Sequence, residues 1–201
     1  MIQAVVFDFG EVICFAPRAE AMENIARCAG VNLQTMRSLM WENRGEYDRG
    51  TYTGREYYRW ILSKADISCS EAVLDELARL DSEAWTNLNP ATLKLMDDVR
   101  AAGLKRAILS NMPLDFLNMA RGRFPIFTDC DAAVFSCETG SIKPESAIYE
   151  KLLAELACGP GETAFFDDMP ANVEKARELG IQAFLWKDAR GARRDLEAAG
   201  V

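Results

Sequence analysis

Polar residues follow four apolar segments of this 201-residue chain, at the point where each segment ends. They are Asp8, Ser110 with Asn111, Ser136 with Lys143 shortly beyond it, and the pair Asp167 and Asp168. Ligands of open parallel α/β sheets bind at the carboxyl ends of the strands. The repetition of the pattern at four segment ends predicts one shared site along such an edge.

Carboxylates dominate this predicted site. Asp8 could accept a phosphoryl group covalently and later lose it to water. Asp167 and Asp168 would repel Asp8 unless a cation lies between them, and carboxylate oxygens suit Mg²⁺, which is therefore the expected occupant. The competing interpretations are local ones, in which Asp8 caps a turn and Asp168 caps the helix that follows Met169.

The remaining polar residues of the predicted site suit an anion. Lys143 precedes Pro144 at the start of a predicted helix, where its ammonium could neutralise a phosphate or the carboxylate of Asp8. Ser110 and the backbone N–H groups after it could hold phosphate oxygens. The alternatives are a solvated surface lysine and a serine that only caps a turn.

The composition narrows the possible chemistry. The chain has no histidine, which excludes histidine triads, histidine-ligated metals and histidine general bases. Its net charge of −8 argues against nucleic acid or an anionic membrane as a partner. No apolar stretch is long enough to cross a membrane, no signal peptide is recognisable, and the cysteine spacing matches neither a zinc site nor a disulfide framework. We therefore expect a cytoplasmic protein.

Strands and helices alternate along the part of the chain that carries most of these residues. Residues 4–7 form an apolar run that suits a strand buried on both faces, and further strands are predicted at residues 105–109, 132–135, 163–166 and 182–186. Helical patterns lie at residues 90–102, 114–121, 144–157, 170–179 and 189–199. This alternation predicts an α/β fold with a parallel sheet.

About 95 residues separate the first two predicted strands, far more than one crossover helix needs. The excess has helical patterns at residues 17–28, 33–47, 53–62 and 70–85, with a capping box formed by Thr53 and Glu56. We predict a core domain of residues 1–15 and 88–201, and an all-helical domain of residues 16–87 inserted above Asp8.

The segments that carry the polar residues resemble, in order, the four motifs of the haloacid dehalogenase-like hydrolase superfamily. Residues 5–13 (VVFDFGEVI) are similar to motif one, and residues 107–111 (AILSN) to motif two. Residues 136–144 (SCETGSIKP) are similar to the S-x-E-x-G-x-x-K-P form of motif three, and residues 165–176 (FFDDMPANVEKA) to motif four. The inserted helices resemble the C1 cap of subfamily I.

The resemblance implies a Rossmann-like core of five parallel strands flanked by helices, with an all-helical cap inserted after the first strand. It implies a Mg²⁺-dependent phosphatase that cleaves a small phosphorylated metabolite, such as a sugar phosphate, through an aspartyl-phosphate, as a monomer or homodimer. It implies that Asp8 is the nucleophile and that Lys143 supports both the nucleophile and the phosphoryl group. Ser110 and Asn111 would bind the phosphate, and Asn172 would position the motif-four loop. The implied metal ligands are Asp8, Asp167, Asp168 and the Gly10 carbonyl.

Position 10 departs from the family pattern. Most phosphatases of the family carry there a second aspartate that acts as general acid and base, an effect worth about 10² to 10⁴ in rate, whereas this chain has Gly10. Three interpretations remain open. They are recruitment of another acid, such as Glu11, Glu46 or Asp48; a substrate with a good leaving group; and binding of phosphate without turnover. A subgroup resembling sugar-phosphate phosphatases also has this glycine, which favours retained activity.

A 2-haloacid dehalogenase is a further alternative, because that branch also lacks the second aspartate. It needs no metal and lacks the paired motif-four aspartates, so the sequence favours a phosphatase. Substrate choice is expected to lie in the inserted helices, where aromatic residues and arginines, among them Trp41 and Arg44, suit a sugar or nucleotide phosphate or simply form a helical core.

Overall fold

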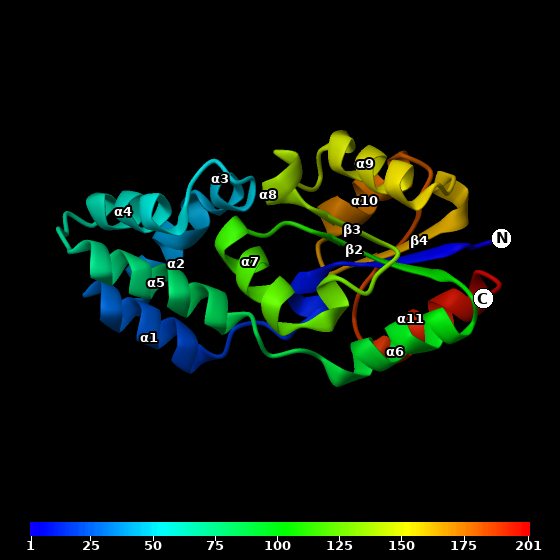
Figure 1. Cartoon of the computed structure of the whole chain (residues 1–201), viewed down its shortest axis with the longest axis horizontal. Coiled ribbons are helices and arrows are strands. Elements are labelled where there is room, and N and C mark those ends of the chain that lie inside the picture. The colour runs from blue at the N-terminus through cyan, green and yellow to red at the C-terminus, as the bar shows by residue number, and fades with distance from the viewer.

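The chain folds around a parallel sheet of five strands in the order β3-β2-β1-β4-β5 (Figure 1). The computed structural model describes residues 1–201. The strands are β1 (Ala4–Phe7), β2 (Lys105–Ser110), β3 (Ala132–Phe135), β4 (Thr163–Asp167) and β5 (Gln182–Leu185). Because β1 pairs with β2 on one side and β4 on the other, Asp8 leaves the sheet at its centre. The predicted α/β fold with five parallel strands is confirmed.

Helices cover both faces of this sheet, as Figure 1 shows. One apolar cluster joins α6, α7 and α11 to one face, and a second joins α9 and α10 to the other. Their bounds are α6 (Pro90–Ala101), α7 (Leu114–Arg123), α9 (Ser146–Leu156), α10 (Pro170–Glu178) and α11 (Ala189–Ala198), with the short α8 (Ser136–Thr139) after β3. The result is a three-layer arrangement in which both faces of the sheet are covered, so a site is expected at the carboxyl ends of the strands.

The strand β1 supplies apolar side chains to both layers. Val5 and Phe7 belong to the cluster on one face, whereas Ala4 and Val6 belong to the cluster on the other. All four residues are buried, which explains why the strand lacks the polar alternation of a half-exposed strand. The expectation of a strand buried on both faces is confirmed.

Five helices lie between β1 and α6 in the sequence and pack around an apolar cluster of their own (Figure 1). They are α1 (Ala19–Ala29), α2 (Leu33–Glu42), α3 (Arg44–Asp48), α4 (Gly54–Lys64) and α5 (Glu71–Ala84), and we call them the inserted helices. Tyr47, Tyr57 and Tyr58 are fully buried in this cluster, and Tyr52 and Trp60 are partly buried against it.

Two predicted helix boundaries among these elements were wrong. The helix predicted over residues 33–47 is broken at Asn43, whose φ of −131° departs from helical geometry. The helix predicted from Pro144 begins only at Ser146, after a cis peptide bond between Lys143 and Pro144. The capping box of Thr53 and Glu56 is present at the start of α4.

The chain leaves and re-enters the sheet layer through two adjacent segments. Cys14 pairs with Leu88 in an isolated antiparallel bridge, and the N–H of Phe15 donates to the carbonyl of Asn87 at 2.9 Å. These contacts place the end of α5 next to the segment that follows Asp8. Both segments that connect the inserted helices to the sheet layer therefore lie close to Asp8 in the chain or in space.

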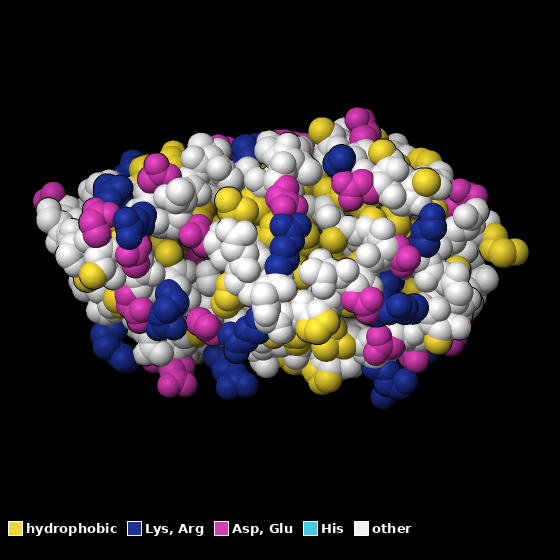
Figure 2. All heavy atoms as spheres, in the orientation of Figure 1, with side chains coloured by type: hydrophobic (Ala, Val, Ile, Leu, Met, Phe, Trp, Pro, Cys, Tyr) yellow, Lys and Arg dark blue, Asp and Glu magenta, His cyan; other side chains and the backbone are white.

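Charged side chains of both signs are interspersed over the face of the molecule drawn in Figure 2. Charged side chains of the inserted helices form ion pairs with one another, such as those of Arg55 with Asp75 and of Arg59 with Glu71. None of the helices is both long and apolar enough to span a membrane.

Candidate active site

The ammonium of Lys143 contacts residues from three neighbouring strands of the sheet. Its Nζ lies 2.7 Å from Asp8 Oδ1, which follows β1, and 2.7 Å from Asp167 Oδ2 at the end of β4. It also donates to the carbonyl of Leu109 in β2 at 2.9 Å. The lysine is almost fully buried, so its charge is balanced by these oxygens rather than by water. The alternative of a solvated surface lysine was wrong.

Asp167 is fully occupied by protein donors. Its Oδ2 accepts from Lys143 at 2.7 Å and from the side-chain amide of Asn172 at 3.1 Å, and its Oδ1 accepts from the same amide at 2.9 Å and from the N–H of Met169 at 2.8 Å. A carboxylate has about four acceptor positions. Asp167 thus anchors Lys143 and the start of α10, and has no acceptor position left for a metal.

Asp168 differs from Asp167 in its burial and in its contacts. Its side chain is only partly buried and forms no ion pair or hydrogen bond with another side chain. It does not cap α10, because the N-cap residue of that helix is Met169, and the carboxylate that accepts from the Met169 N–H is that of Asp167. The alternative interpretation of Asp168 as a helix cap was therefore wrong, and its oxygens are available to a ligand.

The carboxylate oxygens of Asp8, Asp167 and Asp168 lie within 4.8 Å of one another. Asp8 Oδ1 accepts from the N–H of Phe9 at 2.7 Å and contacts Lys143, which leaves Oδ2 without a protein donor. Hard oxygen donors at this spacing fit Mg²⁺. Asp8 and Asp168 would hold the ion directly, while Asp167 fits a supporting position better than the direct one that the resemblance implies.

The titration of these groups reflects their burial. Burial raises the pKa of Asp8 to about 7, against the opposing attraction of Lys143 and with a contribution from Asp167. Burial also raises the pKa of Asp168 to about 6, with contributions from Asp167 and Glu11. Burial alone would lower the pKa of Lys143, but the two aspartates outweigh it and raise that pKa. One ammonium thus faces three carboxylates, an excess of negative charge that a divalent cation would relieve.

Ser110 is the last residue of β2 and Asn111 follows it, and their side chains make different contacts. The amide of Asn111 donates to the carbonyl of Lys143 at 3.0 Å and accepts from the N–H of the same residue at 2.8 Å. This reciprocal pair fixes the loop that carries the lysine, so Asn111 acts there as a positioning residue. Ser110 makes only a 3.4 Å contact with the carbonyl of Asn111 and lines the cavity above Asp8, where its hydroxyl suits the predicted phosphate contact.

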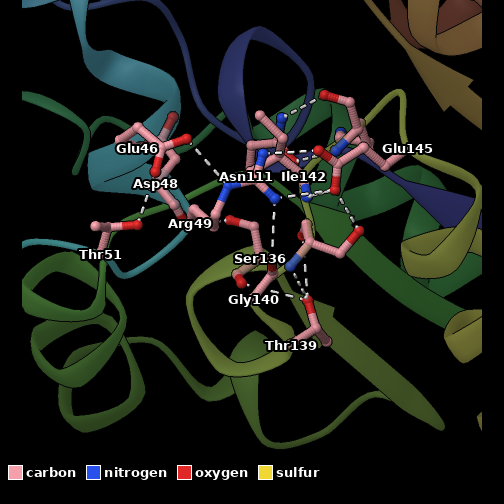
Figure 3. Close-up of polar contacts among 12 residues, drawn as sticks. Glu46, Asp48, Arg49, Thr51, Asn111, Ser136, Thr139, Gly140, Ile142 and Glu145 are labelled. Atoms are coloured by element: carbon pink, nitrogen blue, oxygen red, sulfur yellow. Dashed lines mark hydrogen bonds and ion pairs between the residues drawn. The ribbon is translucent and has the colours of Figure 1, made fainter.

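Ser136 does not take part in the predicted site. Its hydroxyl donates to the carbonyl of Asp48 and accepts from the N–H of Met112 at 2.9 Å. Figure 3 shows it below α3, at the contact between the inserted helices and the motif-three loop. Ser136 therefore attaches α3 to the sheet layer.

A second contact attaches the same segment. The guanidinium of Arg49 pairs with Glu145 at 2.7 Å and donates to the carbonyl of Gly140 at 3.0 Å (Figure 3). Glu145 also accepts from the hydroxyl of Ser141 at 2.8 Å. Together these contacts hold the C-terminal end of α3, and with it Asp48, above the edge of the sheet.

A cavity of about 240 Å³ opens above Asp8 between the sheet and the inserted helices. Its wall includes the predicted residues Asp8, Gly10, Ser110, Asn111, Lys143 and Asp168. Asp167 lies beneath this wall, fully buried. Apart from Ser136, the structure thus brings the predicted site residues together, six at the cavity surface and one behind it.

Of the three candidate acids, two line this cavity. Asp48 and Glu11 are part of its wall, whereas Glu46 is not, because it accepts instead from Arg49 at 3.2 Å and from Thr51 at 2.8 Å. Burial raises the pKa of Asp48 to about 6, against the attraction of Arg44. An acid whose pKa is near neutrality suits proton transfer.

Position 10 could accommodate a side chain. Gly10 has φ −62° and ψ 131°, an extended conformation that any residue adopts. A Cβ atom there would lie 3.5 Å from the ring of Trp85, an ordinary contact. The absence of the second aspartate is therefore a property of this sequence that the local backbone does not impose.

Trp85 is a wall residue that the sequence interpretation missed. It follows α5 and lines the cavity beside Gly10. The bridge between Cys14 and Leu88 explains its position. An insertion that leaves and returns at one place must bring its last helix next to its first residues, and this argument could have identified Trp85.

Comparisons with known proteins agree with this fold. The chain matches the haloacid dehalogenase-like hydrolase family over residues 2–180. It is 28% identical over 200 residues to a Mycobacterium tuberculosis protein named as a phosphatase, covering 96% of this chain and 91% of that protein. It is 25% identical over 211 residues to a D-ribitol-5-phosphate phosphatase of Bacteroides thetaiotaomicron, covering 98% of this chain and 97% of that enzyme.

Among solved structures, a HAD family enzyme of Bacteroides thetaiotaomicron in complex with magnesium and inorganic phosphate superposes with a TM-score of 0.77 at 21% identity, over 94% of this chain and 96% of that one. Some relatives are much longer, and the chain spans only 19% of a mouse acyl-CoA dehydrogenase family member. The match over residues 2–180, together with the fold, shows that the chain belongs to the haloacid dehalogenase-like hydrolase family.

Proposed function

We propose that this protein is a magnesium-dependent phosphomonoester hydrolase that acts through an aspartyl-phosphate on Asp8. The observation that carries the proposal is the buried ammonium of Lys143, 2.7 Å from Asp8, beside the free carboxylate of Asp168. A cation site and a nucleophile on one cavity wall suit a dianionic phosphate. The family relatives named as phosphatases support the same activity.

The carboxylate of Asp8 is the nucleophile in this proposal. Its Oδ1 is held by Phe9 and Lys143, and its Oδ2 has no protein donor, so attack on phosphorus and binding of the cation would be divided between the two oxygens of one carboxylate. The attacking oxygen forms a bond to phosphorus as the bond to the ester oxygen breaks, and the leaving oxygen takes a proton. Water then attacks phosphorus and loses a proton, and the carboxylate of Asp8 leaves. Bound Mg²⁺ would supply positive charge to the phosphoryl oxygens.

We propose Asp48 as the acid that protonates the leaving oxygen. It is buried in the cavity wall, and its pKa of about 6 leaves a protonated fraction near neutral pH. Arg44 contacts its Oδ1 at 2.8 Å, which leaves Oδ2 for the proton. Glu11, the other acid on the wall, is exposed to solvent.

Leaving-group dependence tests this role. Asp48→Asn is expected to lower kcat for glycerol 3-phosphate about 10²-fold and to leave p-nitrophenyl phosphate nearly unchanged, because nitrophenolate needs no proton to leave. Glu46→Gln is the matched control, since that residue faces Arg49 and Thr51. A Gly10→Asp substitution in the Asp48→Asn background should restore part of the lost rate. An equal loss on both esters would contradict the role, and a loss confined to Glu11→Gln would transfer it to Glu11.

We further propose that residues 16–87 act as a cap domain over a core of residues 1–15 and 88–201. The support for this division is that the inserted helices have their own apolar cluster and contribute Trp41, Asp48 and Trp85 to the cavity wall. A substrate that enters the cavity would therefore contact both parts.

The activity is tested with a panel of sugar and nucleotide phosphates, assayed for phosphate release with Mg²⁺ and with EDTA. We expect release that depends on Mg²⁺. Binding of magnesium and phosphate without release would show a phosphate-binding protein instead. Halide release from 2-haloacids in EDTA would show a dehalogenase. That reaction needs no metal ion, so it would leave the clustered carboxylates of Asp8 and Asp168 unexplained.

A further inference from the structure

A second cavity of about 290 Å³ adjoins the first on the side of the inserted helices. The two cavities share Glu11, Trp41, Arg44 and Trp85 as wall residues. A phosphate placed at Asp8 would therefore direct the rest of an ester toward this second space. The far part of its wall includes Arg37 on α2.

We propose that the second cavity receives the organic part of the substrate and that Arg37 binds a second anionic group at its far end. The substrate class is then a phosphomonoester with a carboxylate or another phosphate at the opposite end of a short polyol chain. This inference rests on the proposed phosphatase function, because it assigns the phosphate end to Asp8.

Arg37 differs from the other arginines of the inserted helices. Five of them form ion pairs with acidic side chains: Arg44, Arg49, Arg55, Arg59 and Arg79. Arg27 donates to the side chain of Asn24 at 3.0 Å. Arg37 has neither an ion pair nor a hydrogen bond from its side chain and is exposed at the cavity wall. Arg18, which precedes α1, is also exposed and unpaired but lines neither cavity. Arg37 is therefore the one unpaired arginine of this region on a cavity wall.

The other charged groups of the second cavity do not compete for this role. Arg44 is enclosed by Asp48 at 2.8 Å and Asp81 at 3.0 Å, so its charge is already neutralised. Asp81 is buried in that contact. Glu11 is an exposed acceptor between the two cavities, which would repel an anion but could accept hydrogen bonds from hydroxyl groups. The distribution of charge favours hydroxyl groups near Glu11 and an anion at Arg37.

Apolar surface covers the remainder of the passage. Trp41 is 63% exposed although it lies on the wall of both cavities. The guanidinium of Arg44 lies 5.9 Å from the centre of its ring and supports it from the protein side. Trp85 is partly buried on the same walls. The C–H faces of a polyol or sugar could pack on these rings.

The test compares two esters that differ only at the end opposite the phosphate: 6-phospho-D-gluconate, which has a carboxylate there, and D-glucitol 6-phosphate, which has a hydroxymethyl group. We expect the wild-type protein to prefer the carboxylate by about 10-fold in kcat/KM, through a lower KM, at low salt. Arg37→Gln should abolish the preference and leave glucitol phosphate within about twofold. Arg37→Lys should retain part of it, and higher ionic strength should weaken it.

Arg27→Gln is the matched control, because Arg27 is also an exposed arginine of the inserted helices but lies outside both cavities. No preference in the wild-type protein, or an equal loss on both esters in Arg37→Gln, would overturn the inference. Failure to release phosphate from these esters and from p-nitrophenyl phosphate would instead contradict the proposed function. Calorimetric binding of both esters to Asp8→Asn, with and without Arg37→Gln, tests the anion site without turnover.

Discussion

The two walls of the cavity above Asp8 are built in opposite ways. On the wall formed by the sheet, Lys143 and the underlying Asp167 have filled all of their contacts with protein atoms. On the wall formed by the inserted helices, Trp41 is exposed, and in the adjoining second cavity Arg37 forms no ion pair. Groups that must be held in one geometry are saturated, whereas groups that would meet a variable substrate are left open.

This difference suggests that one wall positions the reacting groups and the other recognises the substrate. A saturated buried group cannot adapt without leaving a charge unpaired, so it favours a single arrangement of the reacting atoms. An exposed arginine or tryptophan can adapt to different ligands at little cost. The sheet wall is therefore expected to carry out the phosphoryl transfer, and the helical wall to supply the proposed acid Asp48 and to determine which ester is used.

The largest expected effect is on the sheet wall. Asp8→Asn should lower kcat about 10⁴-fold or more, since an amide is a poor nucleophile and the remaining groups cannot replace it. Steady-state phosphate release from the best ester of the panel measures the loss. Glu174→Gln, an exposed acid on α10, should retain full activity. Turnover of Asp8→Asn at the wild-type rate would place the nucleophile elsewhere.

The two aspartates of motif four should separate stability from metal binding. Asp167→Asn weakens the pairing of the buried Lys143 and should lower the free energy of unfolding by about 3–5 kcal/mol. Asp168→Asn removes only an unpaired carboxylate, so it should leave the unfolding free energy in EDTA unchanged or slightly higher. Both variants should lose Mg²⁺-dependent activity. Urea denaturation in EDTA makes the comparison, and equal destabilisation would contradict the distinction.

The response to pH should reveal the same carboxylates. The pKa of Asp8 (about 7) and of Asp168 (about 6) are raised in the folded protein. The folded state therefore binds more protons than the unfolded chain between about pH 4 and pH 7. Stability without metal should fall as the pH rises through this window. Asp48, whose pKa is also raised to about 6, acts in the same direction.

Magnesium should offset this loss, because it takes the place of the bound protons. We expect the rise in Tm on adding saturating Mg²⁺ to be about 5 °C at pH 8 and much smaller at pH 5. Thermal melts followed by circular dichroism measure the two shifts. Asp168→Asn should abolish the shift at pH 8. A shift that is as large at pH 5 would argue against a cation among these carboxylates.

The smallest effect is expected where the two walls are joined. Arg49→Ala removes the exposed pair with Glu145, and exposed pairs contribute only about 0.2–1 kcal/mol. KM should rise about two- to fivefold as α3 loosens, with kcat less affected. Glu145→Gln should have a similar effect, and the double variant should be no worse than either single one. Additive losses would show that the two residues act independently.

The sheet wall could be predicted from the sequence because topology alone assembles it. Parallel strands end at one edge, so Asp8, Ser110 and Asp168 had to meet once the strands were identified. What the sequence could not predict was how the contacts are divided. The distinction between Asp167 and Asp168 depends on four hydrogen bonds, and the role of Asn111 depends on a loop 32 residues away.

The helical wall was harder to predict, because its residues are placed by packing between helices. The break at Asn43 changes the direction of the chain before Asp48, and a continuous helical pattern across it gave no indication of the turn. Glu46 and Asp48 are two residues apart and looked equivalent in the sequence. Their neighbours Arg49 and Arg44 decide which one faces the cavity.

The three contacts of Lys143 have a consequence for the whole sheet. Its Nζ atom contacts a residue at the end of each of β1, β2 and β4. All three contacts can form only when these neighbouring strands are correctly aligned along their length. A slip of a few tenths of an ångström in any strand would stretch one of these contacts. Core substitutions far from the cavity that shift a strand should therefore lower kcat even when the protein remains folded.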